Sequence, residues 1–151
     1  MYHFIVARIV RGSFRGLSRG DYTAATRLMA ERCRYRFVGR HALGGERRTR
    51  AAIERWFQRF LRLLPGFQFV PERVLVGGWP WRTTVMTLLR VSWKKPDGTV
   101  YENLAMQTVT LRWFRAVDIV TVDDSQAVAA LLGELHDRYD LAEAVAAPIE
   151  G

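Results

Sequence analysis

The chain has 151 residues and a mass of 17.4 kDa, with 49% hydrophobic and 25% charged residues. This length suits one globular domain that buries a sizeable core, so we expect a single domain over residues 1–151. A single cysteine, Cys33, excludes an internal disulfide and a cysteine cluster for zinc, and three scattered histidines have no metal-ligand spacing. No apolar run approaches the roughly 20 residues that span a bilayer. We therefore expect a cytoplasmic protein with no metal and no membrane partner.

The charge is strongly basic and unevenly distributed. The net charge is +8 with a pI of about 10.5, and the first 62 residues hold 15 basic but only 4 acidic residues. Such a balance raises nucleic acid or an acidic surface as a partner. Only two of the 23 basic residues are lysines. A codon bias toward arginine explains that ratio with no function attached.

The first third of the chain predicts two helices, a strand and a loop. Apolar residues from Ile5 to Leu17 share one helical face, and this helix is expected to end near Gly20. Asp21 then suits the N-cap of a second helix. The alternation between Cys33 and Val38 is typical of a strand with one buried face, and a glycine-rich loop follows over residues 39–45.

The clearest periodicity predicts a third helix that lies against a sheet. Its apolar residues recur at helical spacing up to Pro65-Gly66: Ile53, Trp56, Phe57, Phe60, Leu61 and Leu64. Beyond it the pattern predicts four strands, over 67–76, 82–93, 99–113 and 117–122. The turn Lys95–Thr99 joins two of them as a hairpin, because Pro96 presets φ and Gly98 supplies a positive φ. Asp124 or Ser125 caps a last helix, so the fold class is α+β with an antiparallel sheet.

One strand face combines amides with apolar residues in a way that suggests a ligand pocket. Tyr101, Asn103, Ala105, Gln107, Val109 and Leu111 alternate on it. If the row lines a concavity, Asn103 and Gln107 orient a ligand by hydrogen bonding. The alternatives are that both amides satisfy buried backbone groups, or that the face is in water. Candidate walls are aromatic, although such residues are more often plain core: Tyr35, Phe37, Trp56, Phe60, Trp79 and Trp81.

Two residues are candidates for proton transfer. His41 lies in the glycine-rich loop, where a titratable ring can serve a cavity mouth or simply be solvated. Asp118, Asp123 and Asp124 gather near the last strand, and a carboxylate at a cavity floor can act as a general base. Asp124 is better explained as a helix cap and Asp123 as its solvated neighbour. Asp118 is therefore the carboxylate without another explanation.

Several of these segments, in this order, resemble the SnoaL-like members of the superfamily that contains nuclear transport factor two, ketosteroid isomerase and SnoaL-type polyketide cyclases. The segments are Gly20-Asp21, the stretch 37–45, the helix 50–57, the Pro-Asp-Gly turn, Tyr-Glu-Asn at 101–103 and Ala-Ala-Pro-Ile at 146–149. The resemblance covers nearly the whole chain. It implies a cystatin-like α+β barrel, in which a cone-shaped, curved antiparallel sheet wraps around N-terminal helices and encloses a cavity. It also implies dimerisation through the outer sheet face.

The catalytic positions of the related enzymes are changed here. Phe37 or Val38 stands where the isomerases place their carboxylate, and Gln107 stands where cyclases can carry a histidine. The stretches 88–90 and 120–122 lack the aspartates of the epoxide hydrolases. The turn after Trp113 has no glycine, which leaves the direction of Asp118 open.

Three hypotheses follow. In the first, the protein binds an apolar, ring-bearing metabolite in a pocket. If this protein is an enzyme, it is a cofactor-free isomerase, cyclase or lyase. The second is a non-catalytic homodimeric interaction or ligand-binding module that uses the outer face, namely Glu102, Leu104, Met106, Thr108 and Thr110. The third and weakest is nucleic-acid binding, because the basic residues are not interleaved with exposed aromatics.

Overall fold

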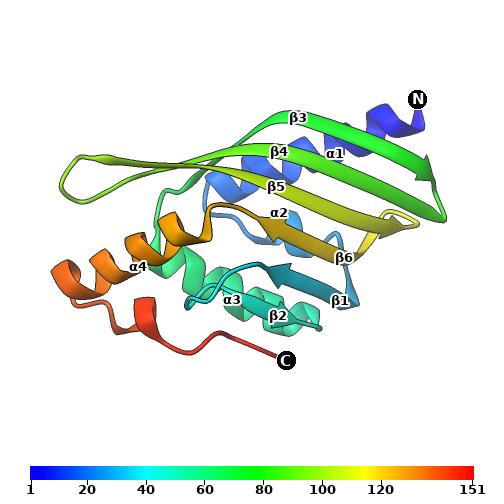
Figure 1. Ribbon diagram of the computed structural model, residues 1–151. Coiled ribbons are helices and arrows are strands. Elements are labelled where there is room, and N and C mark those ends of the chain that lie inside the picture. The colour runs from blue at the N-terminus through cyan, green and yellow to red at the C-terminus, as the bar shows by residue number, and fades with distance from the viewer.

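The computed structural model describes residues 1–151 and has a six-stranded sheet at its centre (Figure 1). The strand order is β2-β1-β6-β5-β4-β3. The strands are β1 (Met29–Phe37), β2 (Gly45–Arg47), β3 (Gln68–Trp79), β4 (Arg82–Lys94), β5 (Val100–Arg112) and β6 (Arg115–Val122). The helices are α1 (Tyr2–Ser18), α2 (Thr23–Thr26), α3 (Arg50–Leu63), α4 (Ser125–Tyr139) and the 3₁₀ helix η1 (Ala142–Val145).

The sheet is mixed and largely antiparallel, in agreement with the predicted α+β class. β3, β4, β5 and β6 form an antiparallel meander, whereas β1 and β6 pair in parallel. A parallel pair needs a long crossover connection. Here the crossover consists of β2, α3, β3, β4 and β5. After it, β6 lies beside β1 and runs in the same direction. The short strand β2 lies at the end of the region that the sequence predicted as loop.

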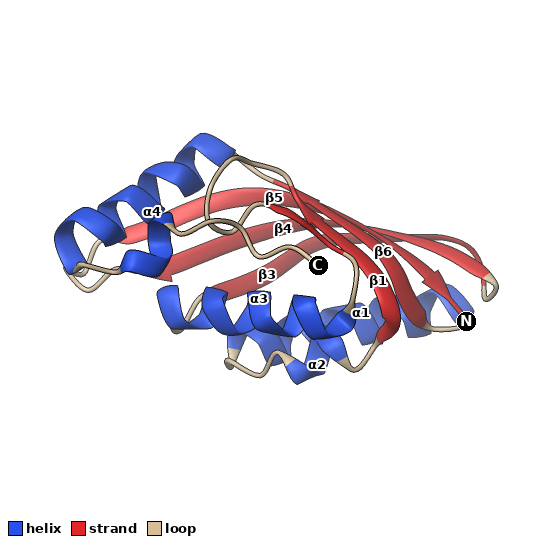
Figure 2. Cartoon of the chain, turned by 90° about the horizontal axis from the view of Figure 1, so that it is seen from below, coloured by secondary structure: helices blue, strands red, loops and turns tan.

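The helices cover one face of the curved sheet and leave the other without a helix (Figure 2). α1 packs against β3, and α3 packs against β1. Inward side chains of β4 alternate with outward ones, and thirty buried hydrophobic residues form a single core cluster. The predicted periodic face of α3 is buried at Ile53, Trp56, Phe57 and Phe60, as the sequence indicated.

Local capping and turn geometry match the predictions at Asp124 and at the β4–β5 turn but not at Asp21. The N-cap of α2 is Tyr22, with no side-chain cap, and the Asp21 carboxylate accepts from the Thr23 amide at 3.1 Å instead. Asp124 caps α4, because its Oδ1 accepts hydrogen bonds from the backbone amides of Gln126 and Ala127 at 3.1 and 3.2 Å. The β4–β5 turn closes through the Lys95 amide, which donates to the Thr99 carbonyl at 2.8 Å. The cap at Asp124 sets where α4 begins, directly after β6. No helix has both the length and the apolar character needed to cross a membrane.

Candidate functional site

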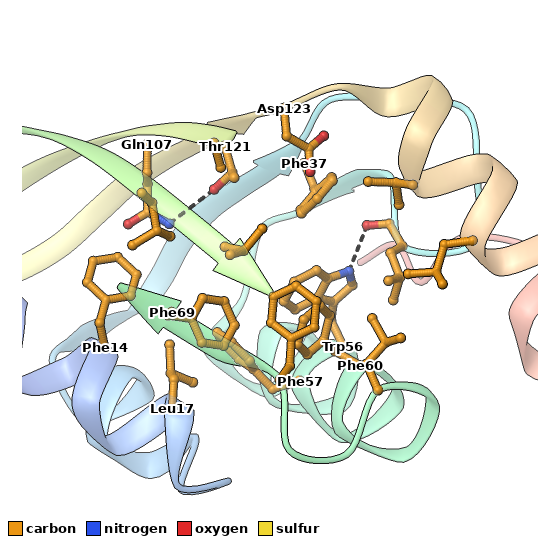
Figure 3. A pocket seen from close by; sticks show the side chains of 18 of the residues that line it. Phe14, Leu17, Phe37, Trp56, Phe57, Phe60, Phe69, Gln107, Thr121 and Asp123 are labelled. Atoms are coloured by element: carbon orange, nitrogen blue, oxygen red, sulfur yellow. Dashed lines mark hydrogen bonds between the residues drawn. The ribbon is translucent and has the colours of Figure 1, made fainter. Parts of the chain in front are cut away.

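A narrow cavity lies between the concave face of the sheet and helices α1, α3 and α4 (Figure 3). Its volume is about 60 Å³, and 18 of its 21 lining residues are hydrophobic. That space holds a few water molecules, so a ring-bearing ligand needs wall side chains or α4 to move. Val128, Leu131 and Leu132 of α4 close one end of the cavity.

Aromatic rings of α3 and β1 form the cavity wall. Trp56 is oriented by its Nε1–H, which donates to the Leu43 carbonyl at 2.8 Å. Its indole stacks on Phe60 with centroids 5.4 Å apart and contacts Tyr35 at 5.0 Å. Phe37 completes this group at 5.8 Å from Trp56. Helical and strand spacing therefore place four of the six predicted aromatic residues in one wall.

Arg47 of β2 supports this wall from behind. Its side chain is fully buried, and its guanidinium lies 5.4 Å from the Tyr35 ring and 5.3 Å from the Trp56 ring. It donates to the backbone carbonyls of Gly44 and Ile149 at 2.8 and 3.0 Å. Arg47 thus ties the loop before β2 and the C-terminal segment to the two rings.

The cavity contains a small group of polar side chains at the β5 and β6 strands. The Gln107 amide donates to the Thr121 hydroxyl at 3.0 Å (Figure 3). Tyr101 also lines the cavity, and its hydroxyl accepts a hydrogen bond from the Asn103 amide at 2.8 Å. Burial raises the pKa of Tyr35 and of Tyr101 to about 12, so both phenols are protonated at neutral pH.

Asp123 is the carboxylate that lines the cavity (Figure 3). Its Oδ1 is buried without a hydrogen-bond partner. Burial, and to a smaller extent the charge of Asp124, raises the pKa of Asp123 to about 6. A carboxyl with that pKa exchanges protons near neutral pH, which is the property of a general acid or base.

The sequence contained a signal for Asp123 that we interpreted otherwise. It follows the inward residues Ile119 and Thr121 at a spacing of two, so the alternation of β6 carries its side chain toward the cavity. We expected a solvated neighbour of Asp124 instead, because two adjacent aspartates before a helix are typical of a cap.

Asp118 lies on the opposite face of the sheet, which corrects its assignment as a cavity carboxylate. The Arg34 guanidinium donates to its Oδ1 at 2.6 Å, and the two residues are neighbours in the parallel β1–β6 register. A register shift between Thr110 and Leu111 sets how β6 pairs with β5. With Ile119 inward, Asp118 must point outward.

His41 lies beside the cavity and does not line it. Its ring contacts the edge of Phe37 at a centroid distance of 5.5 Å and faces a separate open hollow between the loop and α4. Leu132 lines both spaces and separates them. Burial lowers the pKa of His41, and neither ring nitrogen has a hydrogen-bond partner. The structure therefore does not bring His41 together with Asp123 in one cavity.

The other predicted ligand-binding residues divide in the same way. Gln107 lines the cavity. The side-chain amide of Asn103 instead donates hydrogen bonds to the Tyr101 hydroxyl and to the Asp124 carbonyl, the latter at 3.3 Å. Asn103 is half-buried, and its amide hydrogen bonds to neighbouring groups of the protein. Trp79 ends β3 and Trp81 lies in the β3–β4 turn; they are 62% and 58% exposed and do not line the cavity.

The site combines an apolar enclosure with one titratable carboxyl, two phenols and an amide. These are the chemical groups that proton transfer within an apolar enclosure needs. No group of three or more His, Cys, Asp or Glu side chains is placed to hold a metal ion.

Comparison with solved structures identifies the fold. Bal32a from a soil-derived mobile gene cassette is 23% identical, with a TM-score of 0.69 over 81% of this chain and 92% of its own. PrhC from Penicillium brasilianum is 13% identical, with a TM-score of 0.78 over 95% and 96%. TerC, co-crystallised with polyporic acid, is 18% identical, with a TM-score of 0.66 over 83% and 96%. An NTF2-like protein from Burkholderia xenovorans is also similar, at 19% identity and a TM-score of 0.61 over 85% and 96%.

The match of a protein-family model to the amino-acid sequence shows which family the chain belongs to. No curated protein matches this chain. The model of the SnoaL-like domain matches residues 10–130, which include every strand and most of the cavity wall. The chain therefore belongs to the SnoaL-like domain family, with the α+β fold of the NTF2-like proteins.

Proposed function

We propose that this protein, as one SnoaL-like domain over residues 1–151, binds a small, apolar, ring-bearing molecule and catalyses cofactor-free proton transfer on it. The reaction classes that fit are isomerisation, cyclisation and elimination. The observation that carries the proposal is the Asp123 carboxyl, which lines an apolar cavity and has a pKa of about 6. The crystallisation of TerC, a structural relative, with polyporic acid supports small-molecule binding in this fold.

The groups around the cavity suit the two halves of a proton transfer. Ionised Asp123 accepts a proton from a carbon acid, and protonated Asp123 returns it to another atom of the same molecule. The Tyr101 hydroxyl accepts from Asn103, so its own proton is free to be donated to a ligand oxygen that gains charge. The aromatic wall excludes water, which strengthens both interactions.

The test uses nitrobenzisoxazole, an apolar bicyclic carbon acid. A carboxylate removes its ring C–H proton, the N–O bond breaks, and a coloured nitrophenolate forms. We expect the wild-type rate of nitrophenolate formation to rise with pH through about 6, as Asp123 ionises. In Asp123→Asn the rate should be at least about tenfold lower. Asp118→Asn, on the outer face, is the matched control and should keep the wild-type rate.

Equal rates for the wild type and Asp123→Asn would reject acid–base catalysis at this site. Binding is measured separately, by the fluorescence of N-phenylnaphthylamine, an uncharged ring-bearing probe. Gln107→Leu is expected to change that affinity, because the amide lies in the wall. Binding without Asp123-dependent turnover would favour the non-catalytic binding module.

The second candidate, a homodimeric interaction module, rests on the outer sheet face. Leu104 and Met106 are 52% and 39% exposed there, and Met86 of the adjacent strand is 40% exposed. A face this apolar is a candidate for contact with a second copy. Dimerisation is compatible with catalysis, since the cavity lies on the other side of the sheet.

A further inference from the structure

One end of the sheet carries exposed aromatic side chains that the cavity does not use. The β3–β4 turn, the β5–β6 turn and the start of α1 meet there (Figure 1). We call this surface the aromatic end. Its rings are Phe4, Trp79, Trp81, Trp113 and Phe114, which are 69, 62, 58, 66 and 40% exposed.

Direct contacts make the aromatic end one continuous surface. The backbone amide of Trp113 donates to the Pro80 carbonyl at 2.7 Å and joins the two turns. The Tyr2 ring contacts the edge of Phe114 with centroids 5.4 Å apart and joins α1 to the second turn. The two turns and the start of α1 are therefore joined into one surface.

The two aromatic residues of the β5–β6 turn have an unfavourable backbone conformation. Trp113 and Phe114 have φ values of 50° and 64°, in the left-handed region. Two-residue turns of this type normally carry Asn and Gly, because bulky L side chains disfavour positive φ. Two exposed aromatic residues at such a turn are not explained by folding, and strained residues of this kind gather at functional surfaces.

The charge of the aromatic end identifies the class of partner. The segments 1–8, 78–84 and 110–116 contain four exposed arginines and no aspartate or glutamate. The arginines are Arg8, Arg82, Arg112 and Arg115. A second copy docked end to end would bring arginines against arginines, so charge complementarity favours an anionic partner.

Among anionic partners, a bilayer surface fits this end better than a nucleic acid. Trp79 and Trp81 stack on each other with centroids 6.1 Å apart and planes 16° apart, which leaves each indole one open face for a base instead of two. Ile5, 42% exposed next to Phe4, adds an aliphatic group that has no role in base stacking. Tryptophan beside arginine is the combination that settles at the headgroup level of membranes.

We propose that the aromatic end docks on membranes that contain anionic lipids. Trp79, Trp81 and Trp113 enter the headgroup region, while Arg82 and Arg112 contact lipid phosphates. This is peripheral attachment by side chains at one end of the fold, with no segment crossing the bilayer. It departs from the expectation of no membrane partner, which rested only on the lack of an apolar run long enough to span a bilayer. The inference does not depend on the proposed chemistry of the cavity.

The test is co-sedimentation of the full chain with vesicles of phosphatidylcholine, with and without phosphatidylglycerol. We expect binding to the anionic vesicles alone, weakened by at least about tenfold in Arg82→Glu/Arg112→Glu. Arg40→Glu/Arg55→Glu makes the same charge change at exposed arginines of the loop after β1 and of α3, and should weaken binding far less.

Brominated lipids report whether the tryptophans enter the membrane. Trp56 and Trp93 are 2% and 4% exposed, so quenching arises from the three tryptophans of the aromatic end. Trp79→Ser/Trp81→Ser/Trp113→Ser should keep its thermal melting transition and lose co-sedimentation with the anionic vesicles. Equal weakening by both arginine pairs, or vesicle binding without quenching, would overturn the proposal.

Two other results would assign the aromatic end to a different partner and so overturn the proposal as well. One is binding to a single-stranded RNA oligonucleotide, lost in the tryptophan variant, with no binding to anionic vesicles. The other is dissociation of a dimer by the tryptophan variant in sedimentation velocity, again without vesicle binding.

Discussion

At the scale of single residues, Asp123 differs from its neighbour Asp124 although both precede the same helix. The carboxylate of Asp124 accepts two backbone amides, whereas Oδ1 of Asp123 is buried without a partner. Two adjacent aspartates therefore have opposite roles, one in holding α4 and one in facing the cavity. A buried carboxylate without partners destabilises the folded state when it is charged.

This predicts a pH dependence of stability. Because the folded pKa of Asp123 is about 6, above its ordinary 3.8, the folded state binds the proton more tightly. Its contribution favours folding at low pH and is lost as the pH rises from about 4 to about 6. Asp123→Asn should thus be more stable than the wild type at pH 7 by about 1–2 kcal/mol, after allowance for partial solvent contact.

Urea denaturation across this pH range measures the difference. Asp118→Asn is the control, and it should lose stability at neutral pH, since it gives up the contact with Arg34 at 2.6 Å. A stability difference between the wild type and Asp123→Asn that does not vary with pH would contradict the assignment of the raised pKa to Asp123.

At the scale of elements, α4 forms one wall of the cavity, and polar contacts attach this helix to the β4–β5 turn. Its inner residues close the cavity, while its outer side is joined to the β4–β5 turn by an ion-pair cluster. Lys95 and Arg138 contact Glu134 at 2.7 and 2.9 Å, and Arg138 contacts Asp97 at 3.2 Å. We therefore expect α4, which closes the cavity at one end, to be the wall that moves when a ligand enters or leaves.

Weakening this cluster should speed the exchange of a cavity ligand. For Glu134→Gln we expect the dissociation rate of N-phenylnaphthylamine to rise by about two- to fivefold, the effect of losing a partly exposed ion pair. Stopped-flow fluorescence measures that rate. Glu72→Gln, which removes an ion pair of similar length to Arg90 between β3 and β4, is the control and should leave it unchanged.

The pH dependence of the cluster has the opposite sign to that of Asp123. Hydrogen bonding to Lys95 lowers the pKa of Glu134 below its ordinary 4.5. The stabilising contribution of ionised Glu134 is therefore complete above pH 4.5. It is lost as the pH falls through the lowered pKa of the folded state. If α4 is the moving wall, acidification below pH 4.5 should accelerate exchange in the wild type more than in Glu134→Gln. An unchanged ratio of rates would contradict the role of α4.

At the scale of the whole molecule, the two faces of the sheet have separate tasks. Helices and the cavity occupy the concave face, and the other face carries apolar residues without a helix to cover them (Figure 2). This division predicts that a dimer forms through the outer face. Met106→Arg places a charge in its middle and should shift the sedimentation coefficient from dimer to monomer.

Thr84→Arg tests whether position or charge matters, because Thr84 is exposed on the same face near the β3–β4 turn. A weaker effect there than at Met106 would centre the contact on β5. Dimers that persist in Met106→Arg, with unchanged affinity, would count against the outer face.

The sequence by itself determined the order of the longer helices and strands, without the short β2 and η1, and which residues share a face. The α3 stripe, the Lys95–Thr99 turn, the cap at Asp124 and the inward row of β5 are local, since helical and strand periods are properties of the backbone. These patterns placed Tyr35, Phe37, Trp56, Phe60 and Gln107 in the cavity wall.

Only the tertiary structure decided which distant residues meet. The parallel pairing of β1 with β6 and the register shift beside Leu111 turned Asp118 outward. The continuation of the same alternation brought Asp123 into the cavity. Trp79 and Trp81, read as wall residues, instead join Trp113 at the aromatic end. Strand register and the meeting of turns depend on long-range packing, in which a shift of one residue reverses the direction of every side chain, so no local pattern could determine them.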